Sequence, residues 1–304
     1  MKKIIVILVA VIAAVFTSCS NEQAGIITTS NNVVEENANV ANFVALQDQI
    51  STFNDSLGIN HQVTRGFFSR LWKVICADAV GGLFGNLWGG PAGAVVGAAA
   101  CSGGAALENS TRAFAEKKID FRYEMDTDLD GLVPSSTNGS ASNSEDSIGY
   151  FHNKALVNLK NSNKLISIHD MPVLLLDEVK NEIPQNTTFT DKDSVQLNKT
   201  YQEFVANEEK FTGNDISSYE KHLVDCYPSQ SNEIKVICEF LKGITNIDAV
   251  DANSYTSKIL EMVENTQLPG NIKRNLRNGV IVGNASKKLW KLQPKKYEKV
   301  DIKL

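Results

Sequence analysis

The chain has 304 residues, of which 42% are hydrophobic and 21% are charged, and its formal net charge at pH 7 is −5. This composition excludes a disordered chain, which would be less apolar, and a nucleic-acid-binding protein, which would be basic overall. The length is sufficient for one large domain or two small ones, each with a normal hydrophobic core.

Residues 1–18 have the layout of a secretory signal peptide. Lys2 and Lys3 precede an apolar run over residues 4–16, which is too short to cross a membrane as a helix. The run ends in "FTSC", which resembles the lipobox of bacterial lipoproteins in the relaxed form found in Bacteroidales. The resemblance implies that Cys19 becomes the lipid-modified N-terminus of an exported protein at the outer membrane or cell surface.

Residues 19–65 are expected to form an acidic tether, or pro-region. Residues 20–64 carry five acidic residues and neither lysine nor arginine, and one short helix is predicted over residues 40–53. Arg65 is the first basic residue after Lys3, so an Arg-specific protease would first cut there and detach the lipid anchor. The alternative is that Arg65 is an ordinary surface arginine.

Residues 66–122 are predicted to be the membrane-active region. The region opens with aromatic residues between basic ones, a composition typical of segments at a membrane interface, and the aromatic residues are Phe67, Phe68 and Trp72. Residues 79–107 then carry no charge, and this run is longer than the roughly 20 residues that a membrane-spanning helix needs.

Glycine recurs at every fourth position of the uncharged run, at Gly81, Gly85, Gly89, Gly93 and Gly97. Positions four apart lie on one face of a helix, so this glycine zipper leaves a face that another helix can approach at backbone distance. Each interior glycine costs about 0.5–1 kcal/mol relative to alanine, and close helix packing in a membrane would offset that cost. The alternative is a buried helical hairpin at the centre of a domain in water.

Residues 89–91, Gly-Gly-Pro, predict a turn within the zipper, because the residue before a proline avoids the helical region. Two antiparallel arms would then bring Cys76 and Cys101 together at the open end. An even number of cysteines in an exported protein favours disulfides. Proximity in the sequence favours Cys76 with Cys101 and Cys226 with Cys238, and free buried thiols are the alternative.

The lipobox, the acidic pro-region that ends in arginine and the cationic, aromatic opening of a glycine zipper together resemble the proteolytically activated, bacteriocin-like toxins of gut Bacteroidales. The zipper region is also similar to the membrane-active peptides of two-peptide bacteriocins. The resemblance implies an antibacterial toxin that an Arg-specific protease activates and that then damages the target-cell membrane of related bacteria. Arg122 is a candidate for a second cleavage.

Residues 123–149 are expected to form a polar loop. Asp126, Asp128 and Asp130 match the first half of a calcium-binding loop, in which carboxylates at alternate positions face one Ca²⁺ ion. The twelfth position is Thr137 instead of the usual bidentate glutamate, so a plain acidic turn without metal is the alternative. No other cofactor is expected.

Residues 150–304 are predicted to form a helical domain that covers the zipper before activation and recognises a target afterwards. Prolines divide this stretch, and apolar residues recur between them at helical spacing. Residues 273–304 carry ten basic and two acidic residues, an excess of +8 on a chain that is otherwise acidic. An anionic outer-membrane glycolipid is the receptor expected for such a surface, and a solvated basic tail is the alternative.

No catalytic constellation is recognisable in the sequence. The four histidines lack metal-ligand spacing, and neither a nucleophile elbow nor a phosphate-binding loop occurs. The sequence therefore predicts a mainly α-helical exported lipoprotein, with a glycine-zipper hairpin and a helical C-terminal domain, that is an antibacterial toxin and not an enzyme. The alternative is a non-toxic structural or adaptor lipoprotein whose zipper stays packed in its own outer membrane.

Overall fold

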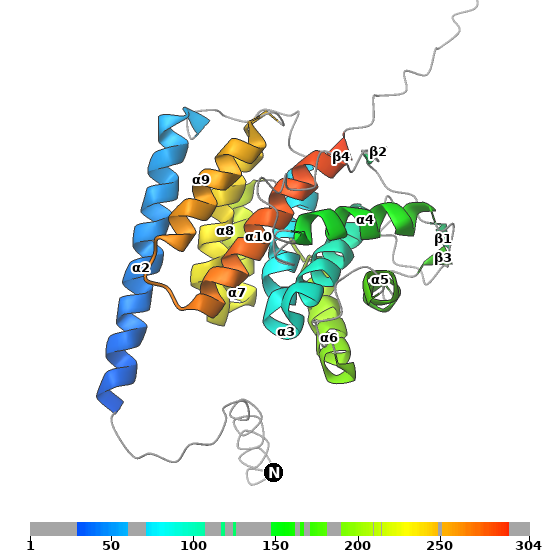
Figure 1. Cartoon of the computed structure of the whole chain (residues 1–304), viewed down its shortest axis with the longest axis horizontal. Coiled ribbons are helices and arrows are strands. Elements are labelled where there is room, and N and C mark those ends of the chain that lie inside the picture. Colours follow the sequence, from blue (N-terminus) through cyan, green and yellow to red (C-terminus); the bar gives the residue numbers. More distant parts are fainter. Residues whose placement is uncertain are drawn as a thin grey trace, which may run out of the picture. The chain divides into compact units, whose positions relative to one another are not determined.

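The computed structural model describes residues 29–59, 71–106, 117–118, 124–125, 147–161, 165–166, 171–180, 190–208, 210–213, 215–248 and 251–291. Helices dominate these residues, so the prediction of a mainly α fold is confirmed (Figure 1). The helices are α2 (Thr29–Ser56), α3 (Leu71–Ala106), α4 (Ile148–Asn161), α5 (Met171–Lys180), α6 (Asp191–Glu208), α7 (Ile216–Cys226), the 3₁₀ helix η4 (Pro228–Gln230), α8 (Ser231–Ile244), α9 (Ala252–Glu264) and α10 (Gly270–Leu289).

Four two-residue strands complete the described elements. β1 (Lys117–Lys118) pairs antiparallel with β3 (Leu165–Ile166). β2 (Glu124–Met125) pairs antiparallel with β4 (Trp290–Lys291). The second pair joins the chain that follows α3 to the end of α10, because β4 continues directly from that helix.

Contacts divide the chain into two units, Met1–Ala38 and Asn39–Leu304. Of the first unit, the structure describes the opening of α2, from Thr29 onwards. The second unit holds α3 and every helix that follows it, so the glycine-rich segment shares one compact unit with the C-terminal helices.

Local sequence signals start several of the C-terminal helices. At α6, Thr190 and Asp193 cap each other reciprocally: the Thr190 amide donates to Asp193 Oδ2 (2.8 Å) and the Asp193 amide donates to Thr190 Oγ1 (3.3 Å). At α7, Asp215 accepts a hydrogen bond from the Ser218 amide (2.8 Å). Pro228 begins η4 between α7 and α8, in agreement with the expectation that prolines divide this region.

The centre of the second unit is α3, which packs against α4, α5, α6, α8 and α10. Side chains of α3 are buried along nearly its whole length because it is surrounded by these helices. The fully buried ones include Val74, Val80, Leu83, Val95 and Val96. The hydrophobic core is therefore built around the segment that the sequence singled out.

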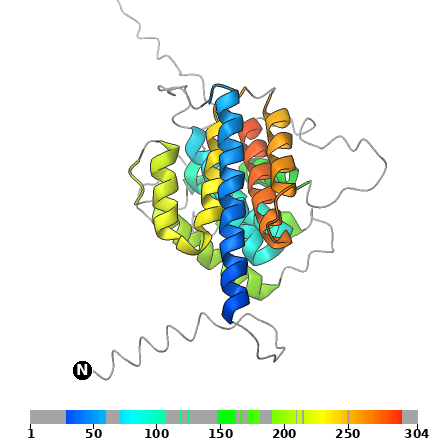
Figure 2. The same ribbon diagram turned by 90° about the vertical axis from the view of Figure 1, so that its left-hand side faces the viewer.

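The second half of α2 differs from the acidic tether that the sequence predicted. Phe43, Leu46 and Ile50 are buried, at alternating spacings of three and four residues, whereas Val40 and Val44 are exposed. This spacing gives the helix one apolar face that packs on the rest of the unit. From Asn39 onwards α2 runs along α8 and α9 (Figure 2), so this part of the chain belongs to the folded body.

Candidate functional site

The segment α3 is a hairpin of two antiparallel arms (Figure 1). The chain turns at Gly90, whose φ of +56° lies in the left-handed region that favours glycine, and Pro91 opens the second arm. A Cβ on Gly81 would lie 2.6 Å from the carbonyl oxygen of Gly97, and a Cβ on Gly85 would overlap the carbonyl of Gly93. The arms therefore meet through bare backbone, and any side chain at these glycines would force them apart.

Helix α10 covers the outer side of the first arm. A Cβ on Gly82 would lie 3.3 Å from the Cβ of Val282, and a Cβ on Gly279 would lie 3.0 Å from the carbonyl oxygen of Ala79. The Asn86 side chain donates to Asn275 Oδ1 (2.5 Å) and accepts from Asn278 Nδ2 (2.7 Å). Because a buried amide needs partners for its polar atoms, these two bonds fix the register between the hairpin and α10.

A buried polar cluster lies near the open end of the hairpin. Asp78 Oδ1 is 3.2 Å from His152 Nε2, and neither side chain is exposed to solvent. His152 Nδ1 lies 2.7 Å from Asn153 Oδ1. The indole Nε1 of Trp290 lies 3.3 Å from Asp78 Oδ2 and 3.1 Å from Ser102 Oγ. The cluster thus joins both arms of α3 to α4 and β4.

The buried polar cluster holds the hairpin against the rest of the body. His152 Nδ1 is within hydrogen-bond distance of Asn153 Oδ1, and His152 Nε2 faces Asp78 Oδ1 at 3.2 Å without hydrogen-bond geometry, while the Ser102 hydroxyl contacts the indole of Trp290. A buried polar side chain that loses its partner retains the cost of removal from water, so these contacts are expensive to break one at a time. Withdrawal of the hairpin from the body would have to separate Asp78 from His152 and Trp290 together.

Aromatic residues surround the beginning of the first arm. The Trp72 ring packs edge-on against Tyr219 (centroids 5.6 Å apart) and Phe211 (6.3 Å). Lys73 Nζ lies 5.2 Å from the centroid of the Phe211 ring. Trp72, which the sequence predicts to meet a membrane, is thus buried against α7 and the segment before it in this state of the protein.

An unusual carboxyl group lies beside these aromatic residues. Burial raises the pKa of Glu208 to about 7, although the hydroxyl of Tyr219, which donates to Glu208 Oε1 (2.6 Å), and the charge of Lys73 both act to lower it. The beginning of the hairpin therefore packs next to a group that changes its charge near neutral pH.

The structure corrects the predicted disulfides, because Cys76, Cys101, Cys226 and Cys238 are all free thiols. The Cβ of Cys101 lies 3.0 Å from the position of a Cβ on Gly81, so this side chain packs on the opposite arm. Cys226 Sγ lies 3.9 Å from His222 Nε2 on its own helix. Burial also raises the pKa of Cys76 and Cys101 well above the usual value, which suppresses the thiolate that oxidation requires.

Several predicted site residues lie outside the described part of the chain and stay predictions. They are the lipidation residue Cys19, the cleavage residues Arg65 and Arg122, the aromatic residues Phe67 and Phe68, and the carboxylates Asp126, Asp128 and Asp130. Gly89 belongs to α3, but its surroundings are also outside that part.

Neither a metal-binding cluster nor a membrane-spanning helix is found in the part of the chain that the structure describes. Its histidine, cysteine, aspartate and glutamate side chains form no group of three or more that could hold a metal ion. Among the same residues, no helix combines the length and the apolar character that a membrane span requires.

Sequence reasoning missed the polar cluster. Its signal is Asp78, the only acidic residue between Arg65 and Leu107, since a carboxyl group within an apolar helix needs a buried partner. The partners His152 and Trp290 could not be chosen from the sequence because they lie far along the chain.

No family model, curated protein or solved structure matches this chain.

Proposed function

We propose that the protein is an antibacterial toxin, exported as a lipoprotein, that stores the α3 hairpin inside a helical body and releases it into the envelope of related bacteria after proteolytic cleavage. The observation that carries the proposal is the contact between the arms. Gly81, Gly85, Gly93 and Gly97 form an interface that is internal to the hairpin. The hairpin can therefore leave the body as a unit without losing this interface.

The remaining surface of the hairpin suits a membrane. Val80, Leu83, Val95 and Val96 are fully buried in the body, and they would face lipid after release. Close contact through small residues is the means by which helices associate in lipid, where the hydrophobic effect between helices is absent. Asp78 precedes the uncharged run, so it would stay at the membrane surface.

The other parts of the proposal come from the sequence. Cys19 carries the lipid anchor, an Arg-specific protease cuts at Arg65, and an anionic outer-membrane glycolipid binds the basic end of the chain. The proposed action on membranes needs no cofactor, and Ca²⁺ at Asp126 and its neighbours would only order the loop.

A second candidate function follows from the polar cluster. The contacts of Asp78 with His152 and Trp290 hold the hairpin in the body, which favours a permanent structural role and hence an adaptor lipoprotein. The two candidates differ in their effect on other cells. A toxin clears a lawn of related strains, whereas an adaptor stays with its own envelope and kills nothing.

The experiment compares the purified protein before and after cleavage with an Arg-specific protease. Both forms are added to sensitive cells and to dye-loaded vesicles that contain anionic lipid. We expect dye release and killing from the cleaved form alone. An Arg65→Ala protein, treated identically, serves as the matched control and should stay inactive. Equal, negligible leakage from all forms would rule out the toxin and favour the adaptor.

A further inference from the structure

The second half of α2 lies on the body through a single face. Leu46 and Ile50 are fully buried and Phe43 nearly so, while Val40 and Val44 on the other side are 42% and 48% exposed. An amphipathic helix with one apolar stripe carries its binding surface within a short stretch of chain. The same contact could therefore form without a covalent link to the rest of the protein.

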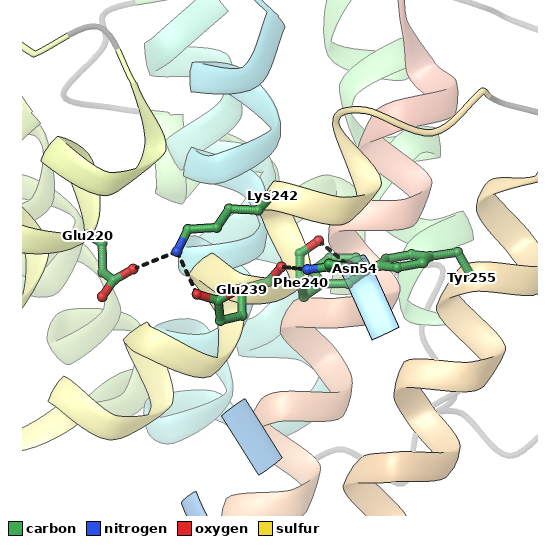
Figure 3. A network of polar contacts seen from close by, with 6 residues as sticks. All are labelled: Asn54, Glu220, Glu239, Phe240, Lys242 and Tyr255. Atoms are coloured by element: carbon green, nitrogen blue, oxygen red, sulfur yellow. Dashed lines mark hydrogen bonds and ion pairs between the residues drawn. The ribbon is translucent and has the colours of Figure 1, made fainter. Parts of the chain in front are cut away.

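The end of this helix adds specific polar contacts (Figure 3). Asn54 is fully buried, its Nδ2 donates to the carbonyl oxygen of Glu239 (3.0 Å), and its Oδ1 accepts from the Tyr255 hydroxyl (2.9 Å). The Phe53 ring stacks on Tyr255 with centroids 5.6 Å apart. A Cβ on Gly243 would overlap the Tyr255 hydroxyl, so the absence of a side chain at Gly243 leaves room for the hydrogen bond between Tyr255 and Asn54.

The surface that receives α2 is held by contacts of its own. Lys242 Nζ lies 3.6 Å from a carboxylate oxygen of Glu220 on α7 and binds Glu239 Oε1 at 2.5 Å (Figure 3). Tyr255 Oη also lies 3.3 Å from the carbonyl oxygen of Phe240 on α8, and its one proton can turn to this oxygen when Asn54 is absent. The Lys242–Glu220 pair joins α8 to α7 without α2, and the Tyr255 hydroxyl can join α9 to α8 in its absence, which lowers the cost of ordering the receiving surface before α2 binds.

We propose that α8 and α9 form a binding site for residues 39–59 that outlasts cleavage of the chain. A cut between Ile59 and Leu71 leaves this docked segment bound to the body, and the same segment supplied as a separate peptide competes for the site. The biological meaning rests on the proposed function: a cut at Arg65 alone leaves the toxin held to its lipid anchor through the docked segment, and dissociation of that segment is a second, separate step that releases the toxin from the producing cell.

The test uses the full chain with the recognition sequence of a specific protease placed at residues 61–66. After complete cutting, native size-exclusion chromatography at micromolar concentration should show the N-terminal fragment eluting with the body. Labelled peptide 39–59 in excess should then exchange into the complex. Separation of the wild-type fragment from the body immediately after cutting would overturn the proposal.

Three variants make the result specific. Ile50→Asp should release the fragment on cutting, whereas Val44→Asp, the same change on the exposed face, should not. Tyr255→Phe removes the donor to Asn54 without a large cavity and should raise the dissociation constant of the fragment about tenfold. Circular dichroism of each uncut protein checks that its helices are intact. If Val44→Asp and Ile50→Asp release the fragment equally, the contact is not the one described.

The proposed function has a separate readout. Co-elution measures only the contact of residues 39–59 and requires neither membrane nor target cell. If the wild-type fragment stays bound, and the cut Ile50→Asp body that has lost its fragment causes no leakage, the function fails while the binding site stands. If the fragment separates at once and the body does leak, the binding site fails while the function stands.

Discussion

Stability should fall with rising pH because of one buried carboxyl group at the beginning of the hairpin. Burial raises the pKa of Glu208 from the usual 4.5 to about 7 in the folded protein. An acid with a raised folded pKa stabilises the fold fully below its unfolded pKa, and this contribution is lost as pH rises through the folded pKa. A difference of about 2.5 pKa units corresponds to about 3 kcal/mol of unfolding free energy, lost between about pH 4.5 and 7.

Glu208→Gln should remove this loss. Glutamine keeps an oxygen that accepts the hydrogen bond of Tyr219 Oη, but it does not ionise. The unfolding free energy of the variant should therefore fall less between pH 5 and pH 8 than that of the wild type. Urea unfolding followed by circular dichroism at each pH gives the comparison. Glu203→Gln is the matched control, because Glu203 is on the same helix and its side chain is 56% exposed.

Parallel curves of unfolding free energy against pH for the wild type and Glu208→Gln would refute this reasoning. If the wild type and Glu208→Gln lose unfolding free energy equally with rising pH, Glu208 ionises in the fold as it does in water. Among the residues that the structure describes, burial also raises the pKa of Glu220 and Glu233, and because both are present in the two proteins their effects cancel in the comparison.

Further substitutions test the packing of the hairpin by the same urea unfolding. Asp78→Ala should cost about 3–5 kcal/mol, because His152 and Trp290 would lose a buried partner, and a cost near zero would contradict the role of the cluster. Gly85→Ala should destabilise by at least about 1–3 kcal/mol, since the new Cβ overlaps the Gly93 carbonyl. Gly270→Ala is its control, because a Cβ there has nothing within 4 Å, and the two changes should differ in sign or clearly in size.

The sequence predicted the hairpin better than its surroundings. Glycine at every fourth position and a Gly-Pro step carry local information on helix contact and turn geometry, and the structure has a turn at Gly90 with the glycines of both arms in contact. These signals depend on backbone properties of individual residues. They could be read without knowledge of the rest of the fold.

Features that depend on distant partners could not be predicted. The burial of Leu46 and Ile50 requires a surface built from helices far along the chain, so the sequence alone predicted a tether with one short helix. Asp78 finds His152 and Trp290 only after three elements have packed together. The predicted cysteine pairs are not formed for a similar reason, because closeness along the chain does not decide whether two thiols have the distance and direction that a disulfide needs.

The central claim is that the hairpin must leave the body to act, and a reversible covalent link tests it most directly. The Cβ atoms of a Gly82→Cys, Val282→Cys variant would lie about 3.3 Å apart, a few tenths of an ångström short of the usual disulfide spacing. The cleaved variant is measured for dye release from anionic vesicles, oxidised and then reduced, beside the two single variants. We expect no leakage from the oxidised form and full leakage after reduction. Equal leakage from both forms would show that the hairpin acts without leaving α10, or does not act at all.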